Sequence, residues 1–354
     1  MISGLVPQLP RIAVIVPNFN DSRHIGRCLK ALLEQSVPPD ELVVVDDCST
    51  DNSVEVIRSI IDGRPGVELV CNPKNLGVYG ALDAGSRLVN CDYIMFVAAN
   101  DFVFPGIIEH AKHCIARYPG VGLWSGMGWL VDDHDRSLGP LALAVPALQD
   151  RYFPPQDCVQ MAWRLGNWFA GPTVVYHKET LESVGRFNPE YRGLADLISA
   201  LMIASKRGAI FVPVPYAVFR QHEGSYLAST LVNPEVLIPL LSGMAAKAPA
   251  LAPELFDPAF CQRIISRFVF AAVRASGGRQ IAAYPAILES WQARWLARLD
   301  CILPENWRLL RVVAAFLVLR SYDVWPSLWN RMLGTAIVAR RHRLIMEGVL
   351  SGNR

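Results

Sequence analysis

Two groups of carboxylate and amide side chains directly follow apolar runs of the chain and could bind a polar ligand. Asp46 and Asp47 end the segment ELVVVDD, and Asn100 and Asp101 follow the apolar run Tyr93–Val97. A carboxylate at such a place can accept a hydrogen bond from the N3–H of uracil or from ribose hydroxyls. Oxygen ligands also suit a hard cation that holds a diphosphate. The alternative for Asn100 and Asp101 is a turn that caps a helix starting near Pro105.

Two shorter motifs carry weaker signals. Pro17-Asn18-Phe19-Asn20 follows the apolar run Ile12–Val16, and alone it could be a turn followed by a helix cap. Asn75-Leu76-Gly77 supplies a glycine that allows a close backbone approach, although most such tripeptides are ordinary turns. Ser49 and Asp51 follow Asp47 and are interpreted as caps of the next helix. These motifs can be interpreted only together with the strands and helices that position them.

Alternating strand and helix patterns predict those elements. Each of four apolar runs is followed by a segment with helical periodicity. The predicted strands are Ile12–Val16, Glu41–Asp46, Val67–Val70 and Tyr93–Val97. This alternation favours a mostly parallel sheet with right-handed crossovers, in which ligands bind beyond the carboxyl ends of the strands. Further strands are predicted at Thr173–Tyr176 and Ile210–Val214, and the chain from about Pro234 onward is mostly helical.

The composition narrows the class of protein. The chain has 354 residues, of which 52% are hydrophobic, so it can bury a sizeable core and is not disordered. Its net charge of +2 is close to balance and does not indicate a nucleic-acid-binding protein. None of its eight cysteines forms a C-x-x-C pair, which fits a reducing cytoplasm and no zinc knuckle. We expect no secretory signal and no membrane-spanning helix.

Taken together and in order, the motifs resemble glycosyltransferase family 2. The matching segments are IAVIVPNFN, ELVVVDDCSTDNS, NPKNLGVYGALDAG, DYIMFVAANDFVFPG, GPTVVYHKETLESVGRFNPEY and LADLISALMIASKRG, and they extend over roughly residues 11 to 225. The resemblance implies an α/β GT-A fold, Rossmann-like, with a mostly parallel sheet flanked by helices. It also implies a nucleotide-sugar donor, a divalent metal and an inverting single displacement. The G-x-G-x-x-G and P-loop patterns of other nucleotide enzymes are missing.

The resemblance implies roles for single residues. Pro17, Asn20 and Asp47 would line the nucleoside pocket, and the wider set of donor-binding residues is Pro17, Asn18, Asn20, Asp46, Asp47, Asn75, Gly77, Asn100, Asp101 and His222. In the family's Asp-x-Asp metal motif, this chain has Ala98 and Asn100, followed by Asp101. Asn100 and Asp101 would hold Mn²⁺ or Mg²⁺, and weak or absent metal dependence is an open alternative. The family's Glu-Asp pair is Ala195-Asp196 here, so Asp196 would be the catalytic base. The alternative is that Asp196 is a structural residue at the N-terminus of a helix, where its negative charge interacts favourably with the helix dipole.

We therefore predict a glycosyltransferase domain over residues 1–232, with a nucleotide-sugar half (11–110) and an acceptor half (111–232). Residues 233–354 form a helical region that contacts a membrane surface, the catalytic domain or a second subunit. The predicted function is transfer from a nucleotide sugar, with UDP expected, to a glycan or lipid-linked acceptor in surface polysaccharide synthesis. The predicted location is the cytoplasm, with peripheral contact at the inner face of the membrane as an option. The alternative is a non-catalytic, nucleotide-sugar-binding or accessory member of the same fold.

One further pair of residues could bind a metal ion. His110 and His113 are three residues apart on a predicted helix, and no third ligand is evident beside them in the sequence. A solvated helix face is therefore favoured over a zinc site.

Overall fold

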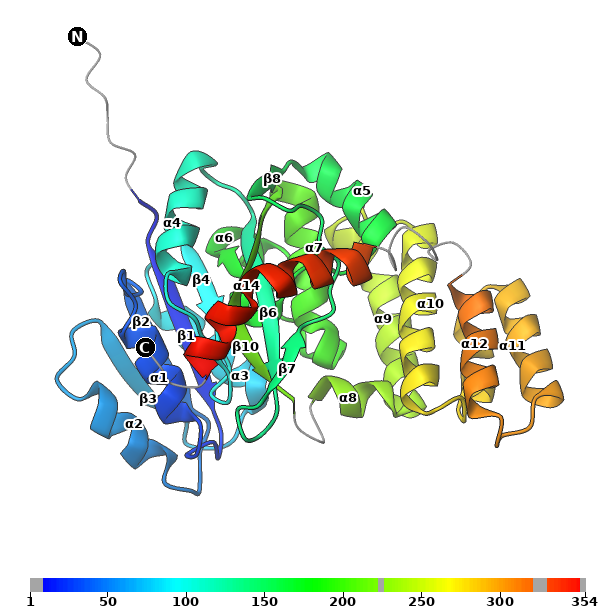
Figure 1. The fold of residues 1–354 in the computed structure, drawn as a ribbon, viewed down its shortest axis with the longest axis horizontal. Helices are drawn as coiled ribbons and strands as arrows, with labels where there is room; N and C mark the ends of the chain where they lie inside the picture. The colour runs from blue at the N-terminus through cyan, green and yellow to red at the C-terminus, as the bar shows by residue number, and fades with distance from the viewer. Residues whose placement is uncertain (1–8, 222–225, 321–329, 351–354) are drawn as a thin grey trace, which may run out of the picture.

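A computed structural model describes residues 9–221, 226–320 and 330–350, and within them a ten-stranded sheet has helices on both faces (Figure 1). The strand order is β3-β2-β1-β4-β9-β6-β10-β5, with β7 beside β6 and β8 beside β10. The strands are β1 (Ile12–Asn18), β2 (Glu41–Asp46), β3 (Val67–Cys71), β4 (Tyr93–Phe96), β5 (Phe102–Val103), β6 (Leu123–Val131), β7 (Ser137–Pro140), β8 (Arg151–Phe153), β9 (Val175–His177) and β10 (Ala209–Arg220).

The helices divide into those that flank the sheet and those that follow it. The flanking helices are α1 (Ile25–Leu33), α2 (Ser53–Ile61), α3 (Gly77–Leu88), α4 (Ile107–Arg117), α5 (Pro155–Leu165), α6 (Lys178–Ser183) and α7 (Ala195–Arg207), with short 3₁₀ turns η1 (Gly171–Thr173) and η2 (Pro189–Leu194). The later helices are α8 (Tyr226–Leu231), α9 (Pro234–Leu251), α10 (Pro258–Ala275), α11 (Ser290–Ile302), α12 (Arg308–Leu319), the π-helical turn η5 (Asn330–Gly334) and α14 (Thr335–Leu350). Two further 3₁₀ turns are η3 (Ile281–Ala283) and η4 (Pro285–Ile287).

The predicted fold class is confirmed. Strands β1 to β4 pair in parallel, as the four strand–helix units predicted. The second half departs from this pattern, because β9 lies antiparallel between β4 and β6. The strand predicted from Thr173 begins at Val175 instead, since Gly171–Thr173 forms the turn η1. The strand predicted at Ile210–Val214 extends over the whole of β10.

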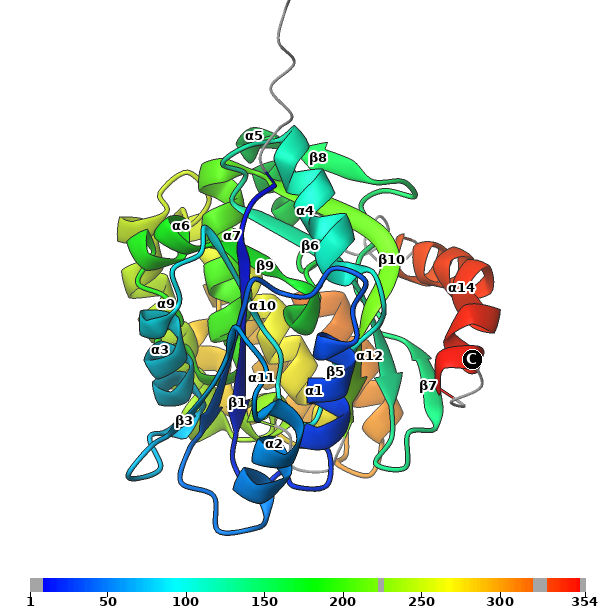
Figure 2. The same ribbon diagram turned by 90° about the vertical axis from the view of Figure 1, so that its left-hand side faces the viewer.

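Strand β1 lies at the centre of the first half and is packed on both faces. Val14 and Val16 contact the layer formed by α1 and α4, whereas Ala13 and Ile15 contact α3. In Figure 2, α3 and α6 lie on one side of β1, and α1 and α4 lie on the other. Gly85 of α3 permits this packing, because a Cβ atom there would lie 2.6 Å from Cγ2 of Ile15.

The helical region after β10 is not a separate layer. Helices α9 and α10 share one hydrophobic core with α5 and α7, while α11 and α12 lie beyond them (Figure 1). Helix α14 returns to the sheet, where Met346 packs with Phe102, Phe104 and Val218. Within the described part of the chain, no helix combines the length and apolar character needed to cross a bilayer.

Candidate functional site

The turns after β1 and β2 are tied together by their own polar side chains. Asn18 donates from Nδ2 to Oδ1 of Asp46 at 2.8 Å and to Oγ of Ser49 at 3.2 Å. The other oxygen of Asp46 accepts the backbone N–H of Ser49 at 3.0 Å. Asn20 has a left-handed backbone (φ 55°), and its Oδ1 accepts the backbone N–H of Thr50 at 2.8 Å. Asn18, Asn20 and Asp46 thus fix the shape of this edge, next to the half-buried Pro17.

Asp47 links the second turn to the third. Its carboxylate accepts from Nδ2 of Asn72 at 2.7 Å and from the backbone N–H of Leu76 at 2.9 Å. Asn75 accepts the N–H of Gly77 at 2.9 Å, and the positive φ of Gly77 (73°) lets α3 begin there. Asp47 is buried, but two carboxylate oxygens offer about four acceptor sites, so capacity for a ligand donor remains.

The turn after β4 is anchored from the far end of β10. Asp101 is buried and its Oδ1 accepts the backbone N–H of Arg220 at 2.8 Å. Burial raises the pKa of Asp101 to about 7, although the hydrogen bond and charge of Arg220 oppose the rise. Asn100 is half-buried, and its carbonyl accepts from Nε of Arg220 at 3.0 Å. Asp101 therefore supports the turn, and Asn100 is the more open of the two candidate metal ligands.

Arg220 is the main residue of this corner that the sequence motifs did not indicate. Its side chain is 2% exposed, and its guanidinium also donates to the carbonyl of Asp132 at 2.8 Å and to Oδ1 of Asp135 at 2.5 Å. Asp135 accepts a second ion pair from Arg27 at 2.6 Å. Burial, followed by the nearby charge of Arg220, lowers the pKa of His24 beside the same corner. The only sequence signal was that Arg220 ends a long apolar strand.

Asp196 lies in the first turn of α7, facing η1 and the end of β10. A Cβ atom added at Gly171 would lie 3.1 Å from Oδ2 of Asp196 and 3.7 Å from the ring of Phe219. The other oxygen, Oδ1, accepts the backbone N–H of Leu197 at 2.8 Å. The side chain is exposed, yet desolvation by the surrounding protein raises the pKa of Asp196. The carboxylate is therefore both accessible from solvent and partly desolvated by neighbouring protein atoms.

The structure brings most of the predicted residues to one edge. Phe219, which lies near Asp196, precedes Arg220 in the chain, and Arg220 binds Asn100 and Asp101. The motifs after β1, β2 and β3 bond to one another at the same carboxyl ends. His222 lies outside the described residues. The site roles of all these residues stay predictions.

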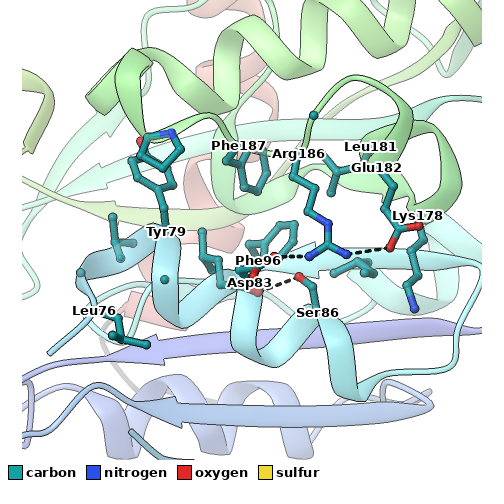
Figure 3. Close-up of a pocket in the computed structure, with 17 residues that line it drawn as sticks. Leu76, Tyr79, Asp83, Ser86, Phe96, Lys178, Leu181, Glu182, Arg186 and Phe187 are labelled. Atoms are coloured by element: carbon teal, nitrogen blue, oxygen red, sulfur yellow. Dashed lines mark hydrogen bonds and ion pairs between the residues drawn. The ribbon is translucent and has the colours of Figure 1, made fainter. Parts of the chain in front are cut away.

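A cavity of about 580 Å³ lies beside this edge, between α3 and the segment from Lys178 to Pro189 (Figure 3). Gly77 is the only predicted site residue among its lining residues. Arg186 crosses one wall and pairs with Asp83 and, at 3.1 Å, with Glu182. The hydroxyl of Tyr79 donates to the carbonyl of Arg192, so this wall is joined to the segment just before Asp196.

Comparisons with known proteins agree with this architecture. Residues 13–118 match the model of the family described as Glycosyl transferase family 2. An uncharacterized glycosyltransferase of Nostoc sp. is 28% identical over 182 residues, which are 51% of this chain and 54% of that relative. The chain thus aligns with about half the length of this curated relative.

Two solved structures share the fold. TarS of S. aureus, in complex with UDP-GlcNAc, has a TM-score of 0.57 at 17% identity, covering 91% of this chain and 90% of the other. A mannosyltransferase of Pyrobaculum calidifontis, in complex with GDP-Man and Mn²⁺, has a TM-score of 0.51 at 22% identity, covering 93% and 87%. The fold is therefore that of the GT-A glycosyltransferases, a class of transferase enzymes. Within that class, the chain resembles glycosyltransferase family 2 over residues 13–118.

Proposed function

We propose that the chain is an inverting glycosyltransferase that takes a sugar from a nucleoside-diphosphate sugar, with UDP as the expected nucleotide. The observation that carries the proposal is the position of Asp196. Its Oδ2 lies beside Gly171 and Phe219, and the next residue in the chain, Arg220, anchors the turn at Asn100. A base and a diphosphate corner on neighbouring segments are what a single displacement requires.

In this reaction, Asp196 would remove the proton of an acceptor hydroxyl as the hydroxyl oxygen attacks C1 of the donor sugar. The bond between C1 and the diphosphate oxygen breaks, and the nucleoside diphosphate leaves with that electron pair. Attack from the side opposite the leaving group inverts the anomeric centre. The raised pKa of Asp196 makes the carboxylate a stronger base than an ordinary aspartate.

The donor would bind across the turns after β1 to β4. Asp47 would accept from the nucleoside, while Pro17, Asn18, Asn20, Asp46, Asn75 and Gly77 would hold the shape of that pocket. A divalent cation, Mn²⁺ or Mg²⁺, would neutralise diphosphate charge. The available ligands fit it only weakly, since Asn100 is neutral and Asp101 is buried on Arg220. We therefore propose weak metal dependence.

Donor identity and metal dependence can be measured together. A panel of UDP-, GDP- and dTDP-sugars should raise the melting temperature only for the matching nucleotide, because a ligand stabilises the state it binds. Mn²⁺ should add little for the parent protein. In Asn100→Asp, the restored charge should increase the effect of Mn²⁺ on donor affinity by about tenfold.

An Asn90→Asp variant is the control for that panel, because it adds a charge at an exposed position just before β4, at the opposite end of that strand from the metal slot. If Mn²⁺ strengthens donor binding equally in both variants, Asn100 does not face the cation. If the panel shows binding but no acceptor is ever glycosylated, the non-catalytic alternative is favoured. That alternative is motivated by the three missing carboxylates, at Ala98, Asn100 and Ala195.

We further propose that the acceptor is a glycan or lipid-linked sugar of a surface polysaccharide, used at the cytoplasmic face of a membrane. The support is an apolar surface on the helical region, which we define as the α12 face. Its exposed members include Leu309 (79%), Leu317 (63%) and Val313, with Ile302 and Trp307 beside them. Exposed apolar side chains of this kind, with the exposed Arg308 beside them, suit the interface of an anionic bilayer.

The double variant Leu309→Asp/Leu317→Asp should reduce binding to phosphatidylglycerol vesicles by at least about tenfold, because the apolar surface of two leucine side chains is no longer transferred from water into the bilayer. Co-sedimentation with vesicles measures this. Leu138→Asp is the matched control, since Leu138 is also exposed but lies on β7. Equal sedimentation of all three proteins would refute a membrane role for the α12 face and would leave subunit contact as its explanation.

A further inference from the structure

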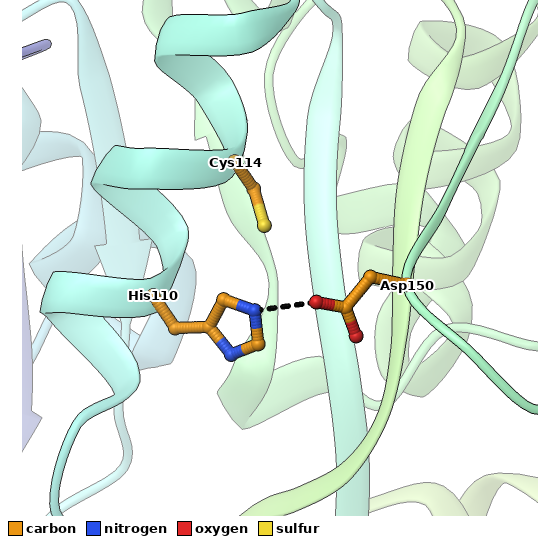
Figure 4. Close-up of side chains that lie close together, drawn as sticks. All are labelled: His110, Cys114 and Asp150. Atoms are coloured by element: carbon orange, nitrogen blue, oxygen red, sulfur yellow. Dashed lines mark hydrogen bonds and ion pairs between the residues drawn. The ribbon is translucent and has the colours of Figure 1, made fainter.

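Three metal-ligating side chains meet on the α4 side of the sheet (Figure 4). His110 and Cys114 are one turn apart on α4, so both project from the same helix face. Asp150 comes from the segment just before β8 and points toward them. One ligand atom from each residue lies within 4.8 Å of the other two. The sequence did not reveal these partners of His110, because Asp150 and Tyr216 lie 40 and 106 residues later in the chain.

The two nitrogens of the His110 ring have different partners. Nε2 lies 2.7 Å from Oδ2 of Asp150, and Nδ1 lies 2.8 Å from the hydroxyl oxygen of Tyr216. If Nδ1–H donates to Tyr216, the lone pair of Nε2 points into the cluster. A metal-bound histidine is normally oriented in this way by a partner on its second nitrogen.

Cys114 has an unusual neighbour. Burial raises the pKa of its thiol, and an interaction with the indole of Trp124 opposes that rise. Trp124 is fully buried, and its indole N–H has no hydrogen-bond partner of ordinary geometry in the described chain. A buried donor without an acceptor is costly, and this indole N–H lies beside the sulfur of Cys114.

We propose that Nε2 of His110, Sγ of Cys114 and a carboxylate oxygen of Asp150 bind a Zn²⁺ ion, with water as the fourth ligand. Nitrogen, sulfur and oxygen together suit zinc, whereas the oxygen-only corner at Asn100 suits Mn²⁺ or Mg²⁺. On binding, the ion replaces the thiol proton, which passes to solvent. Asp150 is exposed, so the ion has a route of entry.

This site lies on the other side of the sheet from the proposed base, Asp196. His110 contacts Trp124 and Tyr216 on the α1 and α4 side of the sheet, whereas Asp196 belongs to α7 on the opposite side. A zinc ion here would join α4 to the chain before β8. The role of the zinc ion is therefore to stabilise the fold, and this role does not depend on the proposed transfer of sugar.

Cobalt(II) added to the purified, metal-free full-length chain tests the proposal. Co²⁺ bound to a thiolate gives an intense near-ultraviolet charge-transfer band, and Zn²⁺ should abolish the band by displacing about one Co²⁺ per chain. The band should be lost in Cys114→Ser and kept in Cys48→Ser and Cys301→Ser, whose parent thiols are exposed. A missing band in the parent, or a band that survives in Cys114→Ser, would overturn the proposal.

A second measurement avoids the risk that a core variant fails to fold. Asp150 is exposed, so Asp150→Asn should fold normally, which circular dichroism can check. Zn²⁺ should raise the melting temperature of the parent and of His113→Ala, and it should have little effect on Asp150→Asn. The same rise in all three proteins would mean that zinc binds elsewhere and that the cluster is only a hydrogen-bonded network.

Discussion

Asp196→Asn is expected to lower the rate of sugar transfer by about 10²–10⁴-fold while nucleotide binding stays unchanged. Asparagine keeps the size of the side chain and can still accept from the N–H of Leu197, as Oδ1 of Asp196 does. It cannot take a proton from an acceptor hydroxyl. The turnover number measured with saturating donor, together with calorimetric titration of the nucleotide, separates the two effects.

Asp157→Asn is the matched control, because Asp157 also lies in the first turn of a helix, α5. If Asp196 only serves the helix dipole, both variants should lose a similar small stability of about 0.3–1 kcal/mol and keep their activity. Loss of turnover in Asp196→Asn alone supports the base. Parent-like turnover in that variant would refute the assignment.

The pH profile gives an independent check on the same residue. Desolvation raises the pKa of Asp196, so its protonated form persists above the usual range of aspartate. The base works only when it is deprotonated, and the transfer rate should therefore rise with pH through that raised pKa. A rate that is constant from pH 4 upward would show that Asp196 does not limit the reaction as a base.

The sequence predicted the first four strands well because each is an uninterrupted apolar run. The residues of β1 from Ile12 to Val16 are fully buried between two helical layers, and such a strand needs no alternating pattern. The strand order beyond β4 could not be read from the same signals. Strand β9 spans only Val175–His177, and the partners on each side of it are fixed by packing rather than by its own residues.

The candidate site was only partly visible in the sequence for a similar reason. A local motif shows that Asn18 and Asp46 are polar residues at strand ends, but not that they bond to each other. The partners of Arg220 lie 85 to 120 residues away, so no short pattern reveals them. His110 was paired in sequence with His113, whereas folding places it against Asp150, 40 residues later.

Arg220→Met is expected to lower the free energy of unfolding by about 3–5 kcal/mol, because it removes one partner of a buried charge network. Methionine keeps much of the apolar stem, but the carbonyls of Asn100 and Asp132 lose their donor. The Ala98–Asp101 turn then loses its anchor. Donor affinity should fall with stability, and urea unfolding and nucleotide-sugar titration measure the two quantities.

Arg27→Met is the comparison that isolates the effect of burial on the stability that the arginine contributes. Arg27 pairs with the same Asp135 and lies over the ring of Phe102, 3.8 Å from its centroid, but its side chain is 35% exposed. Its loss should cost only about 1 kcal/mol, because solvent already screens the pair. If the two variants are equally stable, the guanidinium of Arg220 does not hold the corner. If Arg220→Met is unstable yet binds donor at parent affinity, the corner shapes the fold and not the donor site.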